Sequence, residues 1–158
     1  MPVLSLLIVS TILASPPGDF RGIPFGAQCS TQRDFAPYAV EHRDTPVEIQ
    51  VYSQDGDLLK MGMTPVRTIS YCCWRDRLIR VHVELDRSAA PMLHAYLSAQ
   101  WGVPMHMTGG NEYGWLSPGT MATMSWSDPT LPAVLGIFDQ ALVAEFTDVM
   151  IQQPVTGN

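Results

Sequence analysis

Residues 68–85 read T-I-S-Y-C-C-W-R-D-R-L-I-R-V-H-V-E-L, and this stretch decides the fold. Residues 68–74 and residues 78–85 each alternate in character, with the period of two that a half-buried strand requires. Because only residues 75–77 separate them, we expect an antiparallel hairpin with one buried face and one wet face. The buried face would carry Ile69, Tyr71, Cys73, Ile79, Val81, Val83 and Leu85, and the wetter face Ser70, Cys72, Trp74, Arg80, His82 and Glu84.

Two further hairpins are expected on either side of this stretch. Residues 47–52 alternate in the same way, Asp55-Gly56 suits a tight turn, and residues 58–61 would form the returning strand. Residues 113–116 and 120–127 would form the other hairpin, joined by a Pro-Gly sequence that is typical of a type II turn.

Two helices complete the prediction. Residues 88–101 predict the first, with Ser88 as its cap, Pro91 in its first turn and Gly102 at its end. Near the C-terminus, residues 131–149 would fit one long helix. Gly136, however, costs a helix about 1 kcal/mol relative to Ala. We therefore favour a strand over residues 133–138 and then a helix capped by Asp139, with Leu142, Phe146 and Val149 on its core face.

These elements predict a single α+β domain over residues 19–151. It would have an antiparallel sheet of about five to six strands, with one central and one C-terminal helix packed on it. At 158 residues and 46% hydrophobic content the chain can bury one core. Residues 152–158 would be a frayed tail.

The N-terminal residues are typical of a secretory signal peptide. Residues 3–14 form an uncharged apolar run that is too short to span a bilayer as a helix. No Lys or Arg precedes the run, and Ile12 is large for a cleavage site at Ala14. The alternative is therefore a buried first strand. We expect residues 1–18 to be signal-like and the protein to be exported, either periplasmic or secreted, with no other membrane span.

Three cysteines also bear on whether the protein is exported. Cys29, Cys72 and Cys73 are too few for a disulfide framework, and a bond between the neighbours Cys72 and Cys73 would be strained. If one bridge forms, it would join Cys29 to one of the two and leave one thiol free. The alternative is three reduced and mostly buried cysteines.

Residues 20–26 read Phe-Arg-Gly-Ile-Pro-Phe-Gly. This opening resembles the F-x-G-I-P-W-G start of a loose group of uncharacterised exported bacterial proteins, although Phe25 stands where that group usually has Trp. The order of the later elements is also similar, including Trp101-Gly102-Val103-Pro104 after the helix and a late Leu135-Gly136-Ile137 strand. The resemblance implies an antiparallel sheet with packed helices, and it implies no activity.

The charge balance restricts the partners. The formal net charge is -6 and the nine basic residues are scattered, which argues against a nucleic-acid partner because phosphate binding needs clustered Lys and Arg. Only 15% of the residues are charged, so some apolar surface should remain uncovered and serve a partner. Trp74, Trp115 and Trp126 either contribute to that surface or complete the core.

Three kinds of side chain suggest chemistry. Methionines in pairs suit soft Cu(I), and the candidate ligands are Met61, Met63, Met105, His106 and Met107. The same methionines are also ordinary fillers of an irregular core. The four histidines lack the close pairing of a zinc site, and we expect His82 and His94 to be surface residues.

Cys72, His82 and Glu84 would share a hairpin face, as a thiol enzyme would need. We favour the other interpretation, a chance pairing of solvent-facing side chains. The sequence thus predicts a non-catalytic exported protein that needs no cofactor and binds another protein or an envelope component, such as an inhibitor or immunity-type protein. A copper-binding protein is the alternative, and a thiol-dependent enzyme is the remote one.

Overall fold

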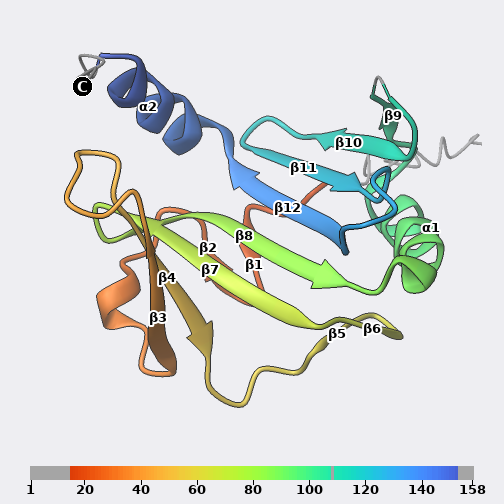
Figure 1. Cartoon of the computed structure of the whole chain (residues 1–158), viewed down its shortest axis with the longest axis horizontal. Coiled ribbons are helices and arrows are strands. Elements are labelled where there is room, and N and C mark those ends of the chain that lie inside the picture. The colour runs from red at the N-terminus through yellow and green to blue at the C-terminus, as the bar shows by residue number, and fades with distance from the viewer. Residues whose placement is uncertain (1–14, 108, 153–158) are drawn as a thin grey trace, which may run out of the picture.

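A computed structural model describes residues 15–107 and 109–152 (Figure 1). Most of the signal-like segment and nearly all of the expected tail, residues 1–14 and 153–158, lie outside the described residues. Within the described part, no helix is both long enough and apolar enough to cross a membrane.

The domain is α+β, as predicted, but its main sheet has eight strands rather than five or six. All strand pairs in it are antiparallel, in the order β3-β4-β7-β8-β12-β11-β10-β9. The strands are β3 (Phe35–Glu41), β4 (Ile49–Gln54), β7 (Thr68–Trp74), β8 (Arg77–Leu85), β9 (Met105–His106), β10 (Glu112–Leu116), β11 (Thr120–Ser125) and β12 (Ala133–Asp139).

The central hairpin is confirmed as β7 and β8, with Ile69 opposite Val83 and Tyr71 opposite Val81. Its two turn residues, Arg75 and Asp76, have φ values of 49° and 61°. Positive φ at both central positions is the mark of a type I′ turn, which matches the twist of a two-residue hairpin. Asp tolerates this conformation well and Arg does not, but the Arg75 guanidinium lies 4.4 Å from the ring centre of Trp74 and gains a cation–π contact.

The predicted face of Ile79 is wrong. The β7–β8 register shifts between Cys72, which pairs with Arg80, and Cys73, which pairs with Leu78. Ile79 is therefore the extra residue of a β-bulge, which breaks the alternation of side chains along β8. As a result Leu78 joins the core on the side of Val81, whereas Ile79 joins the core on the opposite side.

The expected strand over residues 58–61 is also wrong. Leu58 and Leu59 are exposed, and only β5 (Lys60–Met61) and β6 (Thr64–Pro65) pair, as a small separate sheet. The main-sheet partners of β4 are β7 and the unpredicted edge strand β3. A proline, Pro37, lies beside the register shift in β3, which is the position in a sheet that proline tolerates.

The central helix α1 spans Ala90–Trp101 and follows a short 3-10 turn, η2 (Arg87–Ala89). Ser88 does not cap it, contrary to expectation, because the N-cap residue is Ala89 and no side chain caps the helix. The predicted end is confirmed. Gly102 has φ 87°, a conformation that a side chain would disfavour.

The C-terminal strand and helix are confirmed, since β12 is followed directly by α2 (Gln140–Ile151). The Asp139 carboxylate accepts a hydrogen bond from the backbone N–H of Leu142 at 2.8 Å, as an N-cap does. A Cβ at Gly136 would lie 2.5 Å from the ring of Phe138, so a larger residue there would force this half-buried ring to move.

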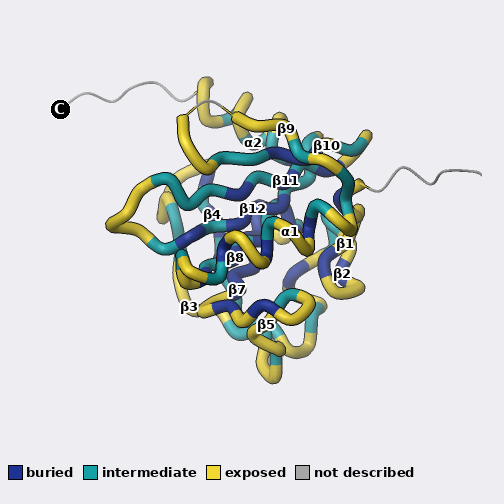
Figure 2. Tube along the Cα trace, turned by 90° about the vertical axis from the view of Figure 1, so that its right-hand side faces the viewer, coloured by how far each residue is buried: buried dark blue, intermediate teal, exposed yellow. Residues whose placement is uncertain are grey.

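The two helices pack on opposite faces of the sheet and define two cores. The larger, the α1-side core, joins Leu93 and Leu97 to the apolar faces of the central strands. The smaller, the α2-side core, consists of Ile49, Val51, Cys72, Trp74, Ile79 and Leu142, with Phe146 and Val149 packed against it. Figure 2 shows that buried residues follow the central strands, whereas exposed residues gather in the loops and at the periphery.

One disulfide joins Cys29 to Cys73, and Cys72 is the free thiol. Of the two alternatives that the sequence left open, the structure has the single bridge, and strand alternation explains why Cys73 is the partner of Cys29. Cys73 faces the α1-side core, where η1 (Cys29–Thr31) lies, whereas Cys72 faces the other core. Backbone bonds hold the same segment, because Gly26 N donates to Leu78 O at 2.8 Å and Leu78 N donates to Ala27 O at 3.0 Å.

Candidate functional site

The main candidate site is a cleft between β4 and β7. The two strands pair from Ile49 opposite Trp74 to Tyr52 opposite Tyr71, and then separate. The chain leaves β4, forms the β5–β6 hairpin and returns to start β7, so this connection encloses the gap. The resulting Tyr38 cleft has a volume of about 450 Å³ and is lined by Tyr38, Ser53, Gln54, Asp55, Gly56, Asp57, Leu59, Arg67, Thr68 and Ile69.

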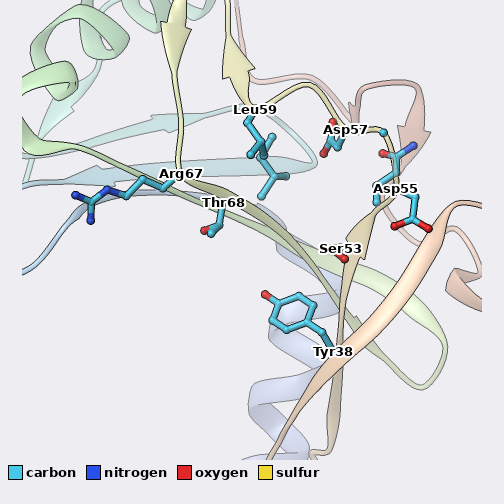
Figure 3. A pocket seen from close by; sticks show the side chains of 10 residues that line it. Tyr38, Ser53, Asp55, Asp57, Leu59, Arg67 and Thr68 are labelled. Carbon is cyan, nitrogen blue, oxygen red and sulfur yellow. The ribbon is translucent and has the colours of Figure 1, made fainter.

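Two large side chains flank the mouth of the Tyr38 cleft. Tyr38 of β3 is 59% exposed, and Leu59 of the connection is 49% exposed. Figure 3 shows them on opposite sides of the opening, with Thr68 beside it and the Arg67 side chain extended away. Arg67 forms an ion pair with Asp86 instead. The cleft therefore offers an aromatic ring and an aliphatic side chain to a ligand, and ligand pockets are lined mainly by side chains of these two kinds.

The wall of the cleft is held in place by Arg21. Arg21 and Gly22 form the turn between β1 (Asp19–Phe20) and β2 (Ile23–Pro24), with φ values of 53° and 79°. From this turn the guanidinium forms an ion pair with Asp57. It also donates to the carbonyl oxygens of Leu58 at 2.7 Å and Lys60 at 2.5 Å.

The Phe-Arg-Gly-Ile-Pro sequence thus has a structural role, since it makes a hairpin whose turn clamps the loop above the cleft. The Tyr71 side chain also contacts this segment of the chain. Its hydroxyl lies 3.0 Å from both the Asp57 carboxylate and the Gln54 side-chain oxygen. Burial raises the pKa of Tyr71 to about 12, so it remains a donor over the physiological pH range. A wall fixed in this way lowers the entropic cost of binding.

Asp55 lines one end of the Tyr38 cleft, and Asp34 lies next to it. Asp34 and Asp55 are both exposed, and the backbone N–H of Asp55 donates to the carbonyl oxygen of Asp34 at 2.8 Å, which places the two residues together. Among the described residues neither carboxylate forms an ion pair with a basic side chain. A ligand with a positive charge near its apolar part would therefore match this end of the cleft.

A second hollow, of about 350 Å³, lies on the other side of Tyr38. The Tyr38 hydroxyl contacts the Ser70 hydroxyl and so separates the two spaces. This Cys72 hollow is lined by Tyr38, Ala39, Glu41, Val51, Ser70, Cys72, Arg80, His82 and Glu84.

The predicted wet position of Cys72 is wrong, because its side chain is only 1% exposed. Tyr38 of β3 and helix α2 cover this face of β7, and strand alternation in the hairpin could not reveal either cover. The hollow does bring Cys72 and His82 together, but the thiol contacts Arg80, at 3.4 Å. His82 instead lies 3.4 Å from Glu84.

We predict that the thiol of Cys72 is unreactive in the folded protein. Burial raises its pKa, against the lowering effect of Arg80. The folded state therefore needs a higher pH than the unfolded state to form the reactive thiolate. Alkylation by iodoacetamide at neutral pH, followed by mass spectrometry, should be about 100-fold slower in the folded protein than in urea. Similar rates in both states would contradict the prediction and revive a thiol enzyme.

The structure does not gather the five candidate copper ligands into one group. The β5–β6 hairpin and β9 lie at opposite ends of the molecule, with α1 between them (Figures 1 and 2). Met61 packs partly against the α1-side core, whereas Met63 is 86% exposed. Met105, His106 and Met107 are all exposed. Copper binding at either pair stays a prediction, which titration with Cu(I) against a competing chelator would test.

The remaining histidine and tryptophan predictions have mixed outcomes. Among the described residues, no group of three or more His, Cys, Asp or Glu side chains is arranged to hold a metal ion. His94 is not an ordinary surface residue, because its ring lies 4.2 Å from that of Tyr113 and is half-buried. Burial lowers its pKa. Trp74 and Trp115 are buried and complete the cores instead of forming a partner surface.

Sequence reasoning missed the residues that make the Tyr38 cleft. Asp55-Gly56-Asp57 was recognised only as a turn, and Tyr38 lies on a strand that was not predicted at all. The one available signal was local, since Leu58 and Leu59 follow that turn directly as two adjacent apolar residues in a polar loop. A scan with protein-family models and searches of curated proteins and of solved structures found no match to this chain.

Proposed function

We propose that this protein is a non-catalytic, exported binding protein that holds a segment of another protein in the Tyr38 cleft. The observation that carries the proposal is the pairing of exposed apolar side chains, Tyr38 and Leu59, with a wall fixed by Arg21 and Asp57. Exposed apolar surface around a preformed concavity is typical of sites that bind partners. An inhibitor or immunity-type protein is one form that such a function takes.

The Cys29–Cys73 bond supports the exported location. Structural disulfides persist in the periplasm and outside the cell, and they are rare in the reducing cytoplasm. The signal-like character of residues 1–18 also agrees with an exported location. A secreted or periplasmic site of action also makes the partner a protein of the same compartment.

Two acidic residues specify the partner further. Asp55 lines the cleft, the exposed Asp34 lies beside it, and the whole chain has a net charge of -6. The partner segment therefore carries a large apolar side chain for the cleft and a Lys or Arg beside it. Such a pattern combines an apolar anchor with charge complementarity, which adds specificity and speeds association.

The test compares two leucines of similar exposure. Leu59 lines the cleft at 49% exposure, whereas Leu116 lies on β10 at 53% exposure and is not part of the cleft. Wild type, Leu59→Glu and Leu116→Glu are used as bait in envelope extracts of the native host, and captured proteins are quantified by mass spectrometry. We expect one partner to be captured by wild type and by Leu116→Glu, and its capture to fall at least about tenfold with Leu59→Glu. Equal capture by all three baits would overturn the proposal, as would the absence of any stoichiometric partner.

A further inference from the structure

We infer that the Cys72 hollow is a second subsite for the same partner segment, in which Glu84 binds a second Lys or Arg of that segment. The segment crosses the exposed ring of Tyr38, which stands between the hollow and the Tyr38 cleft. This inference rests on the proposed function, because it describes a further contact of the same partner. It adds a specificity-determining residue outside the cleft.

The two spaces adjoin along strand β7. Thr68 lines the Tyr38 cleft, and Ser70 lines the Cys72 hollow. Because these residues are two positions apart in one strand, their side chains are on the same face of the sheet. Glu84 of β8 pairs with Thr68 and also lines the hollow. The side chains of directly opposed residues are close neighbours, so Glu84 lies where the hollow adjoins the cleft.

The boundary between the two spaces is a single side chain. Of the described residues, Tyr38 alone lines both. The β3–β4 register shifts between Pro37 and Ala39, and Tyr38 has no partner in it. Tyr38 is therefore the extra residue of a β-bulge, a feature that re-aims a side chain. Its hydroxyl contacts that of Ser70, yet the residue is 59% exposed. A segment can thus lie across the ring and place a side chain on either side of it.

Glu84 is the acidic side chain of the hollow that lacks a basic partner. Glu41, the other one, accepts two bonds from the Arg80 guanidinium, at 3.0 and 3.1 Å. Among the described residues Glu84 forms no ion pair with Lys or Arg, and its polar neighbour is the imidazole of His82, 3.4 Å away. The Glu84 side chain is 39% exposed, so a basic group of a ligand can reach it.

The hollow also favours the strength of such a contact. Ion pairs on an open surface contribute little, whereas a pair that is partly removed from water is less screened. Figure 3 shows Asp55 and Thr68 on opposite sides of the opening between Tyr38 and Leu59, and Glu84 lies beyond Thr68. The partner segment therefore carries a Lys or Arg on each side of its large apolar residue. Charges at two points fix the direction of the segment and exclude partners with a single basic residue.

The experiment uses decapeptides selected from a random displayed library against the oxidised protein. The tightest peptide whose binding is lost in Leu59→Glu but kept in Leu116→Glu is synthesised. In further copies each Lys or Arg is replaced in turn by Met, which removes the charge and keeps an unbranched side chain. Calorimetry then measures the binding of every peptide to wild type, Glu84→Gln and Glu112→Gln.

Glu112 provides the matched control. It is half-buried like Glu84, lines neither space, and lies on β10, three strands away from β8, a separation of about 14 Å. We expect Glu84→Gln to weaken the original peptide at least about fivefold. The same substitution should weaken the peptide that lacks one particular basic residue less than about twofold, because the two groups act as a pair. Glu112→Gln should change the binding of each peptide less than about twofold.

The outcomes separate the two proposals. A Leu59-dependent peptide that binds Glu84→Gln as tightly as wild type would overturn the second subsite and leave the proposed function standing. Equal weakening by Glu84→Gln and Glu112→Gln, or a weakening that no basic residue of the peptide accounts for, would overturn it as well. If no selected peptide depends on Leu59, the inference fails, and the envelope capture experiment then decides the proposed function separately.

Discussion

Replacing Cys29 and Cys73 together with alanine is expected to lower the free energy of unfolding by about 4 kcal/mol. The bond joins residues 44 positions apart, and a cross-link over that length removes this much conformational entropy from the unfolded chain in the loop-closure description. The loss is a large share of the 5–15 kcal/mol that stabilises a typical domain. Urea unfolding of the oxidised wild type and of the double variant measures it.

Two controls isolate the bond from the side chains. Cys72→Ala retains the disulfide and removes only a small buried group, so it should cost about 1 kcal/mol. Wild type kept under a strong reductant should unfold like the double variant, even if that variant cannot be purified in folded form. A difference below about 1 kcal/mol between oxidised and reduced wild type would show that backbone contacts alone fix η1 against the hairpin.

Trp74→Ala is expected to cost about 3–5 kcal/mol, because Trp74 is the largest fully buried side chain in the α2-side core. Its ring centre lies 5.5 Å from that of Phe146 in an edge-to-face contact, and its indole N–H donates to the Pro46 carbonyl oxygen at 3.0 Å. Urea unfolding gives the loss of stability. Hydrogen exchange of the α2 amides should show that α2 loosens first.

Trp74→Phe is the matched control, since it retains an aromatic ring against Phe146 and loses the hydrogen bond to Pro46. It should cost clearly less than Trp74→Ala and leave the exchange of α2 unchanged. The ion pairs of Glu145 with Arg75 and Arg77 lie at the surface, and such pairs contribute little. If Trp74→Ala left α2 as protected as in wild type, these polar contacts would have to hold the helix in place.

The sequence predicted those elements whose cause is local. The β7–β8 hairpin follows from side-chain alternation, and the change from strand to helix near Asp139 follows from Gly136 and a capping carboxylate. Both depend on residues that are close in sequence. The expected face of Cys72 failed because its cover comes from elements far along the chain, Tyr38 of β3 and helix α2.

The Tyr38 cleft could not be predicted for the same reason. It exists because β4 and β7 separate after Tyr52 and Tyr71, and no pattern within either strand marks that point. The edge strand β3 is irregular as well, since its register shifts beside Pro37 and none of its seven residues is fully buried. Leu58 and Leu59 have an apolar pattern that suggests a strand, yet both side chains are exposed at the surface.

Because of the bulge in β8, one residue of the strand, Ile79, could be deleted without changing the pairing of the others. Ile79 has no partner of its own in the ladder, because Arg80 pairs with Cys72 and Leu78 pairs with Cys73. Its side chain nevertheless belongs to the packing beneath α2. Loss of that single codon would restore an uninterrupted strand with every other pairing unchanged, and would remove one aliphatic side chain from beneath the C-terminal helix. A deletion at residue 79 during evolution would therefore change the packing beneath α2 and leave the Tyr38 cleft unchanged.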